Sequence, residues 1–471
     1  MVLTRLEIDG FKNLLGFEAD FGPYTCIAGP NAVGKSNIFD AIRFLSLLAD
    51  TTFIEAASRV RAIDGGPPDL SLLFWDGARP GEPRTMRLAA EMIVPREVTD
   101  DFGRMGTTTA TYLRYELELE DVPTAVESHG RTGGIRLLHE SLSSIDSTGA
   151  VDRIAWLRGR DSFRNAVITA EGGHTTLIST LNEDDGEVAV LVHTEGHDGR
   201  PQKSPARLAP RTAVSTTTTI DAPTILAARN EMRHWSLLAL EPSAMRQPDE
   251  VTAPTTISEN GAHMASALSR MAAVDGGAAY ERVKAAALGL TDVREIDVDS
   301  DAKRELLTLY AGIGPGRMVP ARNLSDGTLR FLALCIMVED PDFNGVICME
   351  EPENGIHPAR MRAMVDLVRS LAVDPDEPLD RSNPLRQVIV NTHSPRFVSM
   401  QNAEDLVLAF NTSITRSNRA AVTVRLHSMR GTWRSTPARV ALTRADVQAY
   451  LVTQEGDQLV VDLLSNDEAG V

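Results

Sequence analysis

The pattern of apolar and polar residues predicts two kinds of strand. Residues 25–28, 346–349 and 387–390 are short and mainly apolar, which is typical of strands buried on both faces of a sheet. Residues 2–9 and 112–120 instead alternate apolar with polar positions, which predicts an opening strand for 2–9 and a half-exposed antiparallel strand for 112–120. We therefore expect a covered sheet together with an antiparallel β lobe that faces solvent on one side.

Apolar residues at helical spacing predict helices in the same chain. They cover residues 37–48, 262–273, 279–289 and 323–338. From about 125 to 235 the pattern breaks into short β-like runs separated by clusters of glycine, aspartate and asparagine, which indicates an elaborated region of strands and loops.

The stretch Gly29–Ser36, GPNAVGKS, fits the P-loop pattern in full. It follows a predicted strand and precedes a predicted helix, which is the context that the chemistry of the motif needs. A match by chance in a chain of this length has a probability on the order of one or two per cent. The residues predicted here to contact a nucleotide are Asn31, Ala32, Val33, Gly34, Lys35, Ser36 and Asn37.

The chemistry of a P-loop is electrostatic. Backbone N–H groups of the turn and the positive end of the helix converge on a phosphate chain. Lys35 would reach the outer phosphates, and the Ser36 hydroxyl would be a ligand of Mg²⁺. The sequence therefore predicts ATP and Mg²⁺ at this site.

Two acidic residues, Glu350 and Glu351, come directly after the apolar run 346–349. The carboxyl ends of parallel strands are where α/β sheets bind ligands. A buried pair of like charges is costly unless a cation lies between them. We therefore expect Glu350 to hold Mg²⁺, which leaves Glu351 to orient or deprotonate a water molecule.

His393 follows the third apolar run, and its strand would end at the same rim of the sheet. A single histidine is more often structural than functional. One that follows an acidic pair at this spacing instead favours a sensor of the γ-phosphate. Glu351 and His393 are thus the predicted catalytic residues.

The composition limits the remaining possibilities. A formal net charge of -18 argues against indiscriminate wrapping of nucleic acid, and the basic stretch Arg200–Arg211 contains three prolines that favour an exposed loop. No apolar run reaches the roughly 18 residues of a membrane span, and the N-terminus lacks the pattern of a signal segment. Cys26, Cys335 and Cys348 lie in apolar runs without metal-ligand spacing. We expect buried thiols in a cytoplasmic protein without a membrane partner.

Four motifs in order, GPNAVGKSN, LSDGT, VICMEEPENGIHP and VIVNTHSP, resemble the P-loop, signature, Walker B with D-loop, and switch histidine of ABC-type ATPase heads. The likeness is greatest to the RecF/SMC-like branch, in particular to prokaryotic stand-alone AAA ATPases near the OLD proteins. It implies an α/β fold with a mixed central sheet and helices, an antiparallel β lobe and an inserted middle region.

The resemblance also implies an assembly. Such heads dimerise head to tail around two ATP molecules, or build larger assemblies from such dimers. Ser325 and Gly327 would then complete the site of the opposite protomer, with the signature helix meeting the γ-phosphate. Lys12 and Asn13 match a position that lies near the nucleotide in such heads.

The motifs divide the chain into four expected parts. An N-terminal ATPase lobe with the P-loop covers residues 1–125, and an inserted region of strands, loops and helices covers 126–302. A C-terminal lobe with the signature, Walker B and switch histidine covers 303–440, and a helical tail covers 441–471.

The chain also departs from the family pattern. Glu350 stands where the usual Walker B residue is aspartate, and neither Gln202 nor Gln247 follows a convincing strand that would make it a Q-loop residue. Coiled-coil arms and a TOPRIM nuclease domain are not recognisable. The effector of such an ATPase would then be a separately encoded protein, possibly a nuclease, in an anti-phage defence system.

Two alternatives remain open at the level of sequence. One is a RecF-like DNA-repair clamp, which the acidic balance disfavours. The other is a nucleotide-binding scaffold with negligible turnover. This alternative is suggested by Glu350, which stands where the family usually has aspartate.

Overall fold

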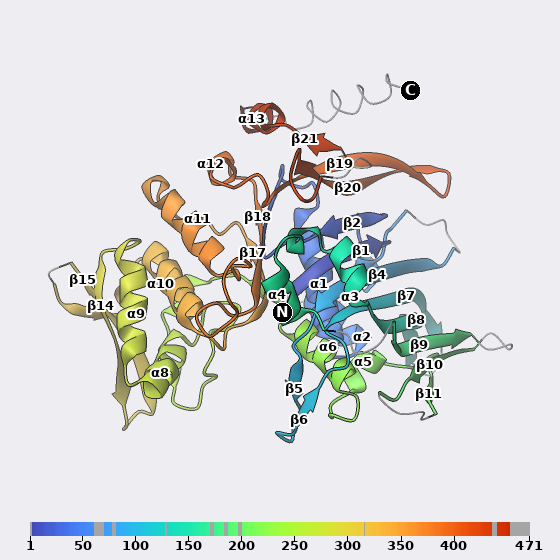
Figure 1. The fold of residues 1–471 in the computed structure, drawn as a ribbon, viewed down its shortest axis with the longest axis horizontal. Coiled ribbons are helices and arrows are strands. Elements are labelled where there is room, and N and C mark those ends of the chain that lie inside the picture. Colours follow the sequence, from blue (N-terminus) through green and yellow to red (C-terminus); the bar gives the residue numbers. More distant parts are fainter. Residues whose placement is uncertain are drawn as a thin grey trace. The chain divides into compact units, whose positions relative to one another are not determined.

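The computed structural model describes residues 2–60, 70–77, 82–127, 130–169, 174–182, 187–195, 200–314, 316–435 and 440–452. The chain is of the α/β class with several sheets, as the sequence predicts (Figure 1). It divides into two compact units. Unit 1 takes residues 1–22, 27–235 and 403–471, and unit 2 takes residues 23–26 and 236–402. The four ranges proposed from the motifs divide the chain on a different basis and stay a prediction.

An antiparallel sheet of eight strands dominates unit 1. Its order is β11-β10-β9-β8-β7-β4-β1-β2, so the strands of the predicted middle region extend the sheet that the N-terminal strands begin (Figure 1). The strands are β1 (Val2–Asp9), β2 (Phe17–Asp20), β4 (Arg84–Ile93), β7 (Tyr112–Glu127), β8 (Gly130–Ser144), β9 (Thr176–Asn182), β10 (Val188–Val192) and β11 (Gln202–Pro205).

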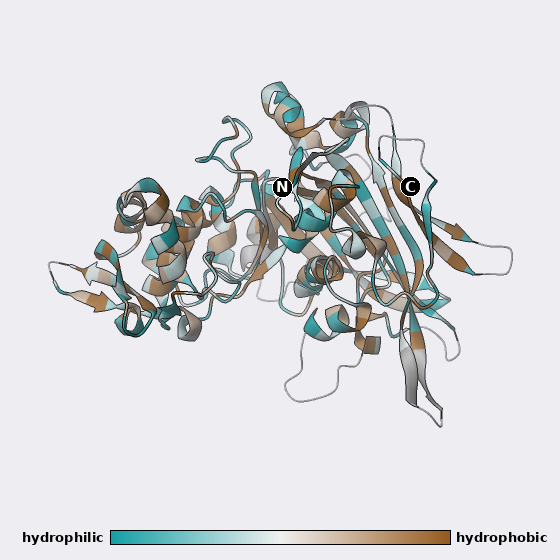
Figure 2. Ribbon diagram, turned by 90° about the horizontal axis from the view of Figure 1, so that it is seen from below, coloured by the Kyte–Doolittle hydropathy of each residue, from teal (hydrophilic) through white to brown (hydrophobic). Residues whose placement is uncertain are grey.

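The predicted half-exposed strand lies in the middle of this sheet, as β7. Leu113, Tyr115, Leu117 and Leu119 are buried on one face of β7, while the residues between them keep partial exposure. Hydrophilic and hydrophobic residues accordingly alternate along the long strands (Figure 2). The antiparallel β lobe expected from the sequence is confirmed.

Helix α1 (Lys35–Leu48) is the central helix of unit 1 and packs against α2 (Phe53–Val60) and α6 (Pro223–Arg233). The short elements of the unit are η1 (Leu70–Leu73), α3 (Ser147–Arg153), η2 (Ala155–Leu157), α4 (Asp161–Val167), α5 (Ala213–Thr216) and the hairpin β5 (Glu97–Thr99) and β6 (Met105–Thr107). Its C-terminal part comprises β19 (Leu406–Arg416), β20 (Arg419–Met429), β21 (Ala441–Leu442) and α13 (Arg444–Val452). Residues 453–471 of the predicted helical tail lie outside the described residues.

Unit 2 contains a parallel sheet of β12 (Ser236–Leu238), β17 (Gly345–Glu350) and β18 (Arg386–Thr392). The helices α10 (Asp326–Glu339) and α11 (Met361–Ser370) pack against each other beside it. A second sheet comprises β13 (Asp249–Glu250), β14 (Val293–Asp301), β15 (Leu306–Ile313) and β16 (Met318–Pro320). The remaining elements are α7 (Pro242–Met245), α8 (Met264–Asp275), α9 (Ala278–Leu288), η3 (Ala321–Asn323), η4 (Pro358–Arg360) and α12 (Pro395–Ser399).

The register of the parallel sheet sets where its strands end. Glu350 on β17 pairs with Asn391 on β18, and Met349 pairs with Leu238 on β12. All three carboxyl ends therefore meet at one edge, where α/β sheets bind ligands. β3 (Tyr24–Ala28) is shared between the units, since its first three residues count with unit 2 and its last two with unit 1.

Two expectations from composition can be compared with the structure. All three cysteines are buried free thiols, as predicted. Within the described ranges, no helix combines the length and the apolar character that crossing a membrane requires.

A carboxyl group is buried in the last turns of α6. Glu231 is fully buried, and its Oε1 accepts a hydrogen bond of 2.8 Å from Trp235 Nε1. No donor among the described residues lies within hydrogen-bond distance of Oε2. Burial raises the pKa of Glu231 to about 7.

We expect Glu231→Gln to stabilise the protein at pH 8 and to have little effect at pH 5. A carboxyl whose pKa is raised by folding binds its proton more tightly in the folded state, so stability falls as pH rises from about 4.5 to 7. Glutamine keeps the acceptor for Trp235 and removes the charge, which should gain on the order of 2 kcal/mol above pH 7. Thermal unfolding of both proteins at several pH values measures this.

Glu377→Gln is the matched control for Glu231→Gln, because Glu377 is exposed. Its melting temperature should follow that of the wild type at every pH. A difference between Glu231→Gln and wild type that does not change with pH would contradict the assignment.

Candidate functional site

The P-loop connects β3 to α1 as the motif predicts. α1 begins at Lys35, one residue after Gly34, and no side chain caps its N-terminus. Its first turn contains no acidic residue, so the positive end of the helix dipole is not neutralised within the helix. Ala32 and Gly34 both have positive φ, 63° and 105°, which folds the loop back over the start of the helix.

Asn13 braces the P-loop from the N-terminal segment. Its Nδ2 donates to the carbonyl of Val33 at 3.3 Å, and its Oδ1 accepts from Asn37 Nδ2 at 2.8 Å. A Cβ at Gly34 would lie 2.4 Å from Asn13 Nδ2, so only glycine fits there. The structure thus brings Asn13 to the loop, while its place near a nucleotide stays a prediction.

Lys12 and Lys35 are both engaged within unit 1. Lys35 Nζ donates to the carbonyls of Gly29 and Pro30, at 2.6 and 2.7 Å. Lys12 Nζ forms an ion pair of 2.6 Å with Asp40, whose side chain is almost completely buried in α1. The nucleotide-facing role of Lys12 stays a prediction, since the ammonium of Lys12 points to Asp40.

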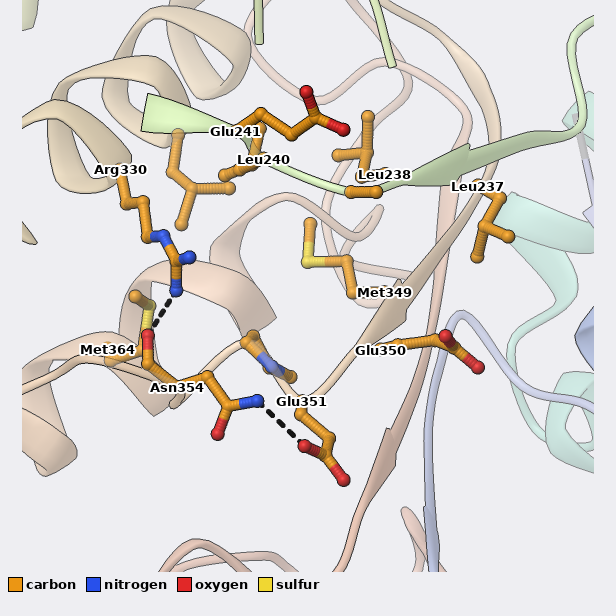
Figure 3. A pocket seen from close by; sticks show the side chains of 13 residues that line it. Leu237, Leu238, Leu240, Glu241, Arg330, Met349, Glu350, Glu351, Asn354 and Met364 are labelled. Atoms are coloured by element: carbon orange, nitrogen blue, oxygen red, sulfur yellow. Dashed lines mark hydrogen bonds between the residues drawn. The ribbon is translucent and has the colours of Figure 1, made fainter. Parts of the chain in front are cut away.

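The two acids after β17 do not form a buried pair, and this expectation from the sequence is wrong. Glu350 is exposed, and Glu351 is partly exposed. Glu351 has a φ of 46°, so the backbone turns at the end of the strand, and the two carboxylates point in different directions (Figure 3). Asn391 Nδ2 donates to Glu350 Oε1 at 3.2 Å, which ties that acid to β18.

The Glu351 carboxylate is held at both oxygens. His393 Nδ1 lies within hydrogen-bond distance of Oε1, and Asn354 Nδ2 donates to Oε2 at 2.7 Å (Figure 3). The backbone N–H of Glu351 also donates to the carbonyl of Asn391 at 2.9 Å. The structure therefore brings together the two predicted catalytic residues, Glu351 and His393.

The signature motif begins α10, as predicted. Ser325 is the N-cap, and its Oγ accepts from the backbone N–H of Thr328 at 3.2 Å. A Cβ at Gly327 would meet the carbonyl of Gly355 at 3.7 Å, so the start of the helix lies beside the loop after β17. Arg330 of α10 donates to the carbonyl of Asn354 in the same loop (Figure 3).

A cavity of about 290 Å³ lies between these elements within unit 2. Its walls are mainly apolar and come from β12 and the segment after it, from α10 and from α11 (Figure 3). Glu241, Glu350 and Glu351 are among its lining residues.

Sequence reasoning missed Glu353, which is the buried acid of this loop. Its side chain is 7% exposed, and burial raises its pKa. Thr392 Oγ1 donates a hydrogen bond to Glu353 Oε1. Nothing in the local pattern distinguishes Glu353 from its neighbours, because burial here results from the contact with β18.

Comparison with known proteins agrees with the motifs. Residues 277–399, about a quarter of the chain, match the family described as "AAA domain, putative AbiEii toxin, Type IV TA system". A DNA replication and repair protein RecF from Acaryochloris marina is 32% identical over 130 residues, which cover 25% of this chain and 33% of that protein. The RecF of Phocaeicola vulgatus is 40% identical over 53 residues, 11% of this chain and 14% of that protein.

These matches support a RecF/SMC-like ABC-type ATPase head in this chain. The chain spans a third or less of the length of these curated relatives. Among solved structures, an Smc head bound to the C-terminal winged-helix domain of ScpA is 12% identical, with a TM-score of 0.43 over 90% of this chain and 97% of that one. The SMC head of Thermotoga maritima is also 12% identical, with a TM-score of 0.33 over 90% and 98% of the two chains.

The residues of the head fit a nucleoside triphosphate with Mg²⁺. The uncapped start of α1 and Lys35 suit a phosphate chain. Within the described ranges, no three His, Cys, Asp or Glu side chains gather as a metal site. Mg²⁺ is usually held by substrate phosphates and one or two protein ligands, and the assignment of Ser36 and Glu350 to that role stays a prediction.

Gln247, one of the two glutamines considered for a Q-loop, follows β12 in the chain. β12 pairs in parallel with β17, and the segment after it supplies Glu241 to the cavity. Gln247 lies further on, is exposed and donates to the carbonyl of Ser243 at 3.4 Å. The three-residue β12 is too short to recognise in the sequence, so neither Gln202 nor Gln247 could be assigned to a Q-loop beforehand.

We expect Gly34→Ala to weaken ATP binding by at least tenfold. The added methyl would lie 2.4 Å from Asn13 Nδ2 at a φ of 105°, so the loop must change shape. Titration with a fluorescent ATP analogue measures the affinity. Gly103→Ala is the control, because Gly103 also has positive φ but no atom near the new methyl. Equal affinities for wild type and Gly34→Ala would contradict the proposed role of the loop.

Proposed function

We propose that this head is an ATP-hydrolysing switch that dimerises on Mg-ATP and controls a separately encoded effector in anti-phage defence. The observation that carries the hydrolytic part is the Glu351 carboxylate, held by His393 and Asn354 at the end of β17. A carboxylate that is fixed in this way can orient a water molecule and accept its proton.

Each part of the site has a chemical task in this proposal. The start of α1 and Lys35 would bind the phosphate chain, and Ser36 and Glu350 would hold Mg²⁺. Mg²⁺, when bound, would neutralise charge that develops on the phosphates. Glu351 directs the water in line with the γ-phosphate, and His393 keeps the Glu351 carboxylate in that orientation.

The dimer in the proposal joins two copies of the chain head to tail. Ser325 is exposed at the start of α10, and Gly327 follows it in the first turn. An exposed helix N-terminus can meet a phosphate of the opposite protomer. In the free chain the Ser325 hydroxyl instead caps its own helix, at 3.2 Å from the Thr328 nitrogen.

The effector part of the proposal has a different basis. The family matched by residues 277–399 carries a toxin and a toxin–antitoxin system in its description. The order of motifs also resembles stand-alone ATPases of defence systems. We therefore place the effector on a separate chain, possibly a nuclease, in the cytoplasm.

We expect Glu351→Gln to lower the turnover of ATP at least about 100-fold while leaving ATP binding intact. The amide keeps the hydrogen bond of the side chain but cannot accept a proton from water. Trapped in the ATP-bound form, this variant should at least double its native mass when Mg-ATP is added. Phosphate release and mass photometry measure the two effects.

Glu377→Gln changes an exposed glutamate outside the four motifs and should match the wild type in both measurements. Ser325→Arg in the Glu351→Gln background should abolish the doubling of mass. If ATP turnover and native mass in Glu351→Gln are both the same as in the wild type, the switch is contradicted and a nucleotide-binding scaffold is favoured.

A second candidate is a RecF-like DNA clamp, which the two RecF relatives favour. The basic stretch 200–211 lies at an outer edge of the unit 1 sheet, where β11 is exposed along its length. Arg207 in this stretch forms an ion pair with Glu187, and this carboxylate weakens the attraction of Arg207 for a phosphate. With a net charge of -18, we rank this candidate second.

If the clamp is correct, reversing the charges of Arg200, Lys203, Arg207 and Arg211 should abolish a steeply salt-dependent affinity for duplex DNA. Fluorescence anisotropy between about 50 and 200 mM salt measures this affinity. Reversal of the exposed Lys303, Arg304, Arg362 and Arg381 gives the same change in net charge and should leave binding intact. Weak binding by wild type that both variants lower equally would count against the clamp.

A further inference from the structure

A buried hydrogen bond connects the loop after β17 with the end of β18. It joins Glu353 Oε1 to the hydroxyl of Thr392, which is completely buried as the last residue of β18. Neither residue faces solvent, and neither is among the residues that the nucleotide motifs assign. The bond is therefore a contact between two elements that each carry a catalytic side chain.

Thr392 uses its hydroxyl twice. It donates to Glu353, and it accepts the backbone N–H of Ser394 at 2.9 Å. The two bonds enclose His393, which lies between Thr392 and Ser394 in the chain. Fixing both neighbours fixes the backbone from which the His393 ring extends.

The loop after β17 is equally constrained. Asn354 N–H donates to the carbonyl of Glu351 at 3.0 Å, and Ile356 N–H donates to the carbonyl of Glu353 at 3.0 Å. These turns hold Glu353 close to Glu351 along the chain. Because Glu353 also binds Thr392, the position of Glu351 and the position of His393 are set by one buried contact.

Packing alone does not explain an acid at this position. Glu353 Oε2 is buried, and no donor in the described part of the chain lies within hydrogen-bond distance of it. A buried acceptor without a partner is unfavourable, and an apolar residue of similar volume would avoid that cost. What glutamate supplies and an apolar residue does not is the directed bond to Thr392.

We propose that Glu353 and Thr392 are positioning residues that hold the His393 imidazole against the Glu351 carboxylate. The inference rests on the proposed function in one respect, since it assigns hydrolytic roles to Glu351 and His393. It predicts that the hydroxyl of residue 392 matters and its methyl group does not. It also predicts that the hydroxyl acts through His393.

The test compares Thr392→Val with Thr392→Ser. Valine keeps the shape and removes the hydroxyl, whereas serine keeps the hydroxyl and removes the methyl. Thr392→Val should lower kcat for ATP roughly ten- to a hundredfold with little change in KM, the scale seen when a supporting hydrogen bond to a functional group is lost. Thr392→Ser, which keeps the hydroxyl, should retain most of the wild-type kcat. The reverse order, with serine worse than valine, means a packing role and overturns the inference.

A double variant separates action through His393 from a general structural effect. In the His393→Ala background, Thr392→Val should lower kcat no further, because the residue that it positions is gone. Full additivity of the two losses would contradict the proposal. Glu353→Gln, which keeps an acceptor for Thr392, should stay closer to wild type than Glu353→Ala.

A measurement without ATP keeps the inference testable if hydrolysis is absent. The rate at which diethyl pyrocarbonate modifies His393, followed by peptide mass spectrometry, reports how firmly the imidazole is held. Thr392→Val should raise that rate at least twofold, and Thr392→Ser should not. If the wild type does not hydrolyse ATP but the modification rates of His393 differ in this way, the proposed function alone is refuted. If the wild type hydrolyses ATP, and all variants share its kcat and its rate of His393 modification, the positioning role alone is refuted.

Discussion

The parallel pairing of β17 with β18 is the constraint on which the candidate site in unit 2 depends. Because Glu350 lies opposite Asn391, the residues that follow each strand emerge at one edge of the sheet. Glu351 and His393 are 42 positions apart in the chain, and the register brings them to the same edge of the sheet, where their side chains are in contact. The backbone bond from Glu351 to Asn391 continues the ladder by one further residue.

Much of this arrangement could be predicted from the sequence. The apolar runs identify β17 and β18, the P-loop identifies the start of α1, and Ser325 identifies the cap of α10. These elements are set by local rules of burial, turn chemistry and capping, and the ordered motifs then indicate the family. The assignments of individual side chains to ATP and Mg²⁺ stay predictions.

Other features depend on contacts that a single sequence does not encode legibly. The positive φ of Glu351 and the burial of Glu353 follow from how the loop docks on β18. The ion pair of Lys12 with Asp40 depends on the packing of the N-terminal segment against α1. The expectation of a buried carboxylate pair was wrong because the strand ends at Glu350, and the chain reverses there.

The Lys35 ammonium is bonded to the backbone of its own P-loop. It donates to two carbonyls, at 2.6 and 2.7 Å, so an anion that draws the ammonium away from them must offset the loss of those bonds. A single phosphate would replace good hydrogen bonds with bonds of similar quality. A chain of phosphates that also binds the N-terminus of α1 would form additional hydrogen bonds there. On this argument we expect the loop to prefer a polyphosphate to free phosphate, because only the longer ligand offsets these bonds at more than one point.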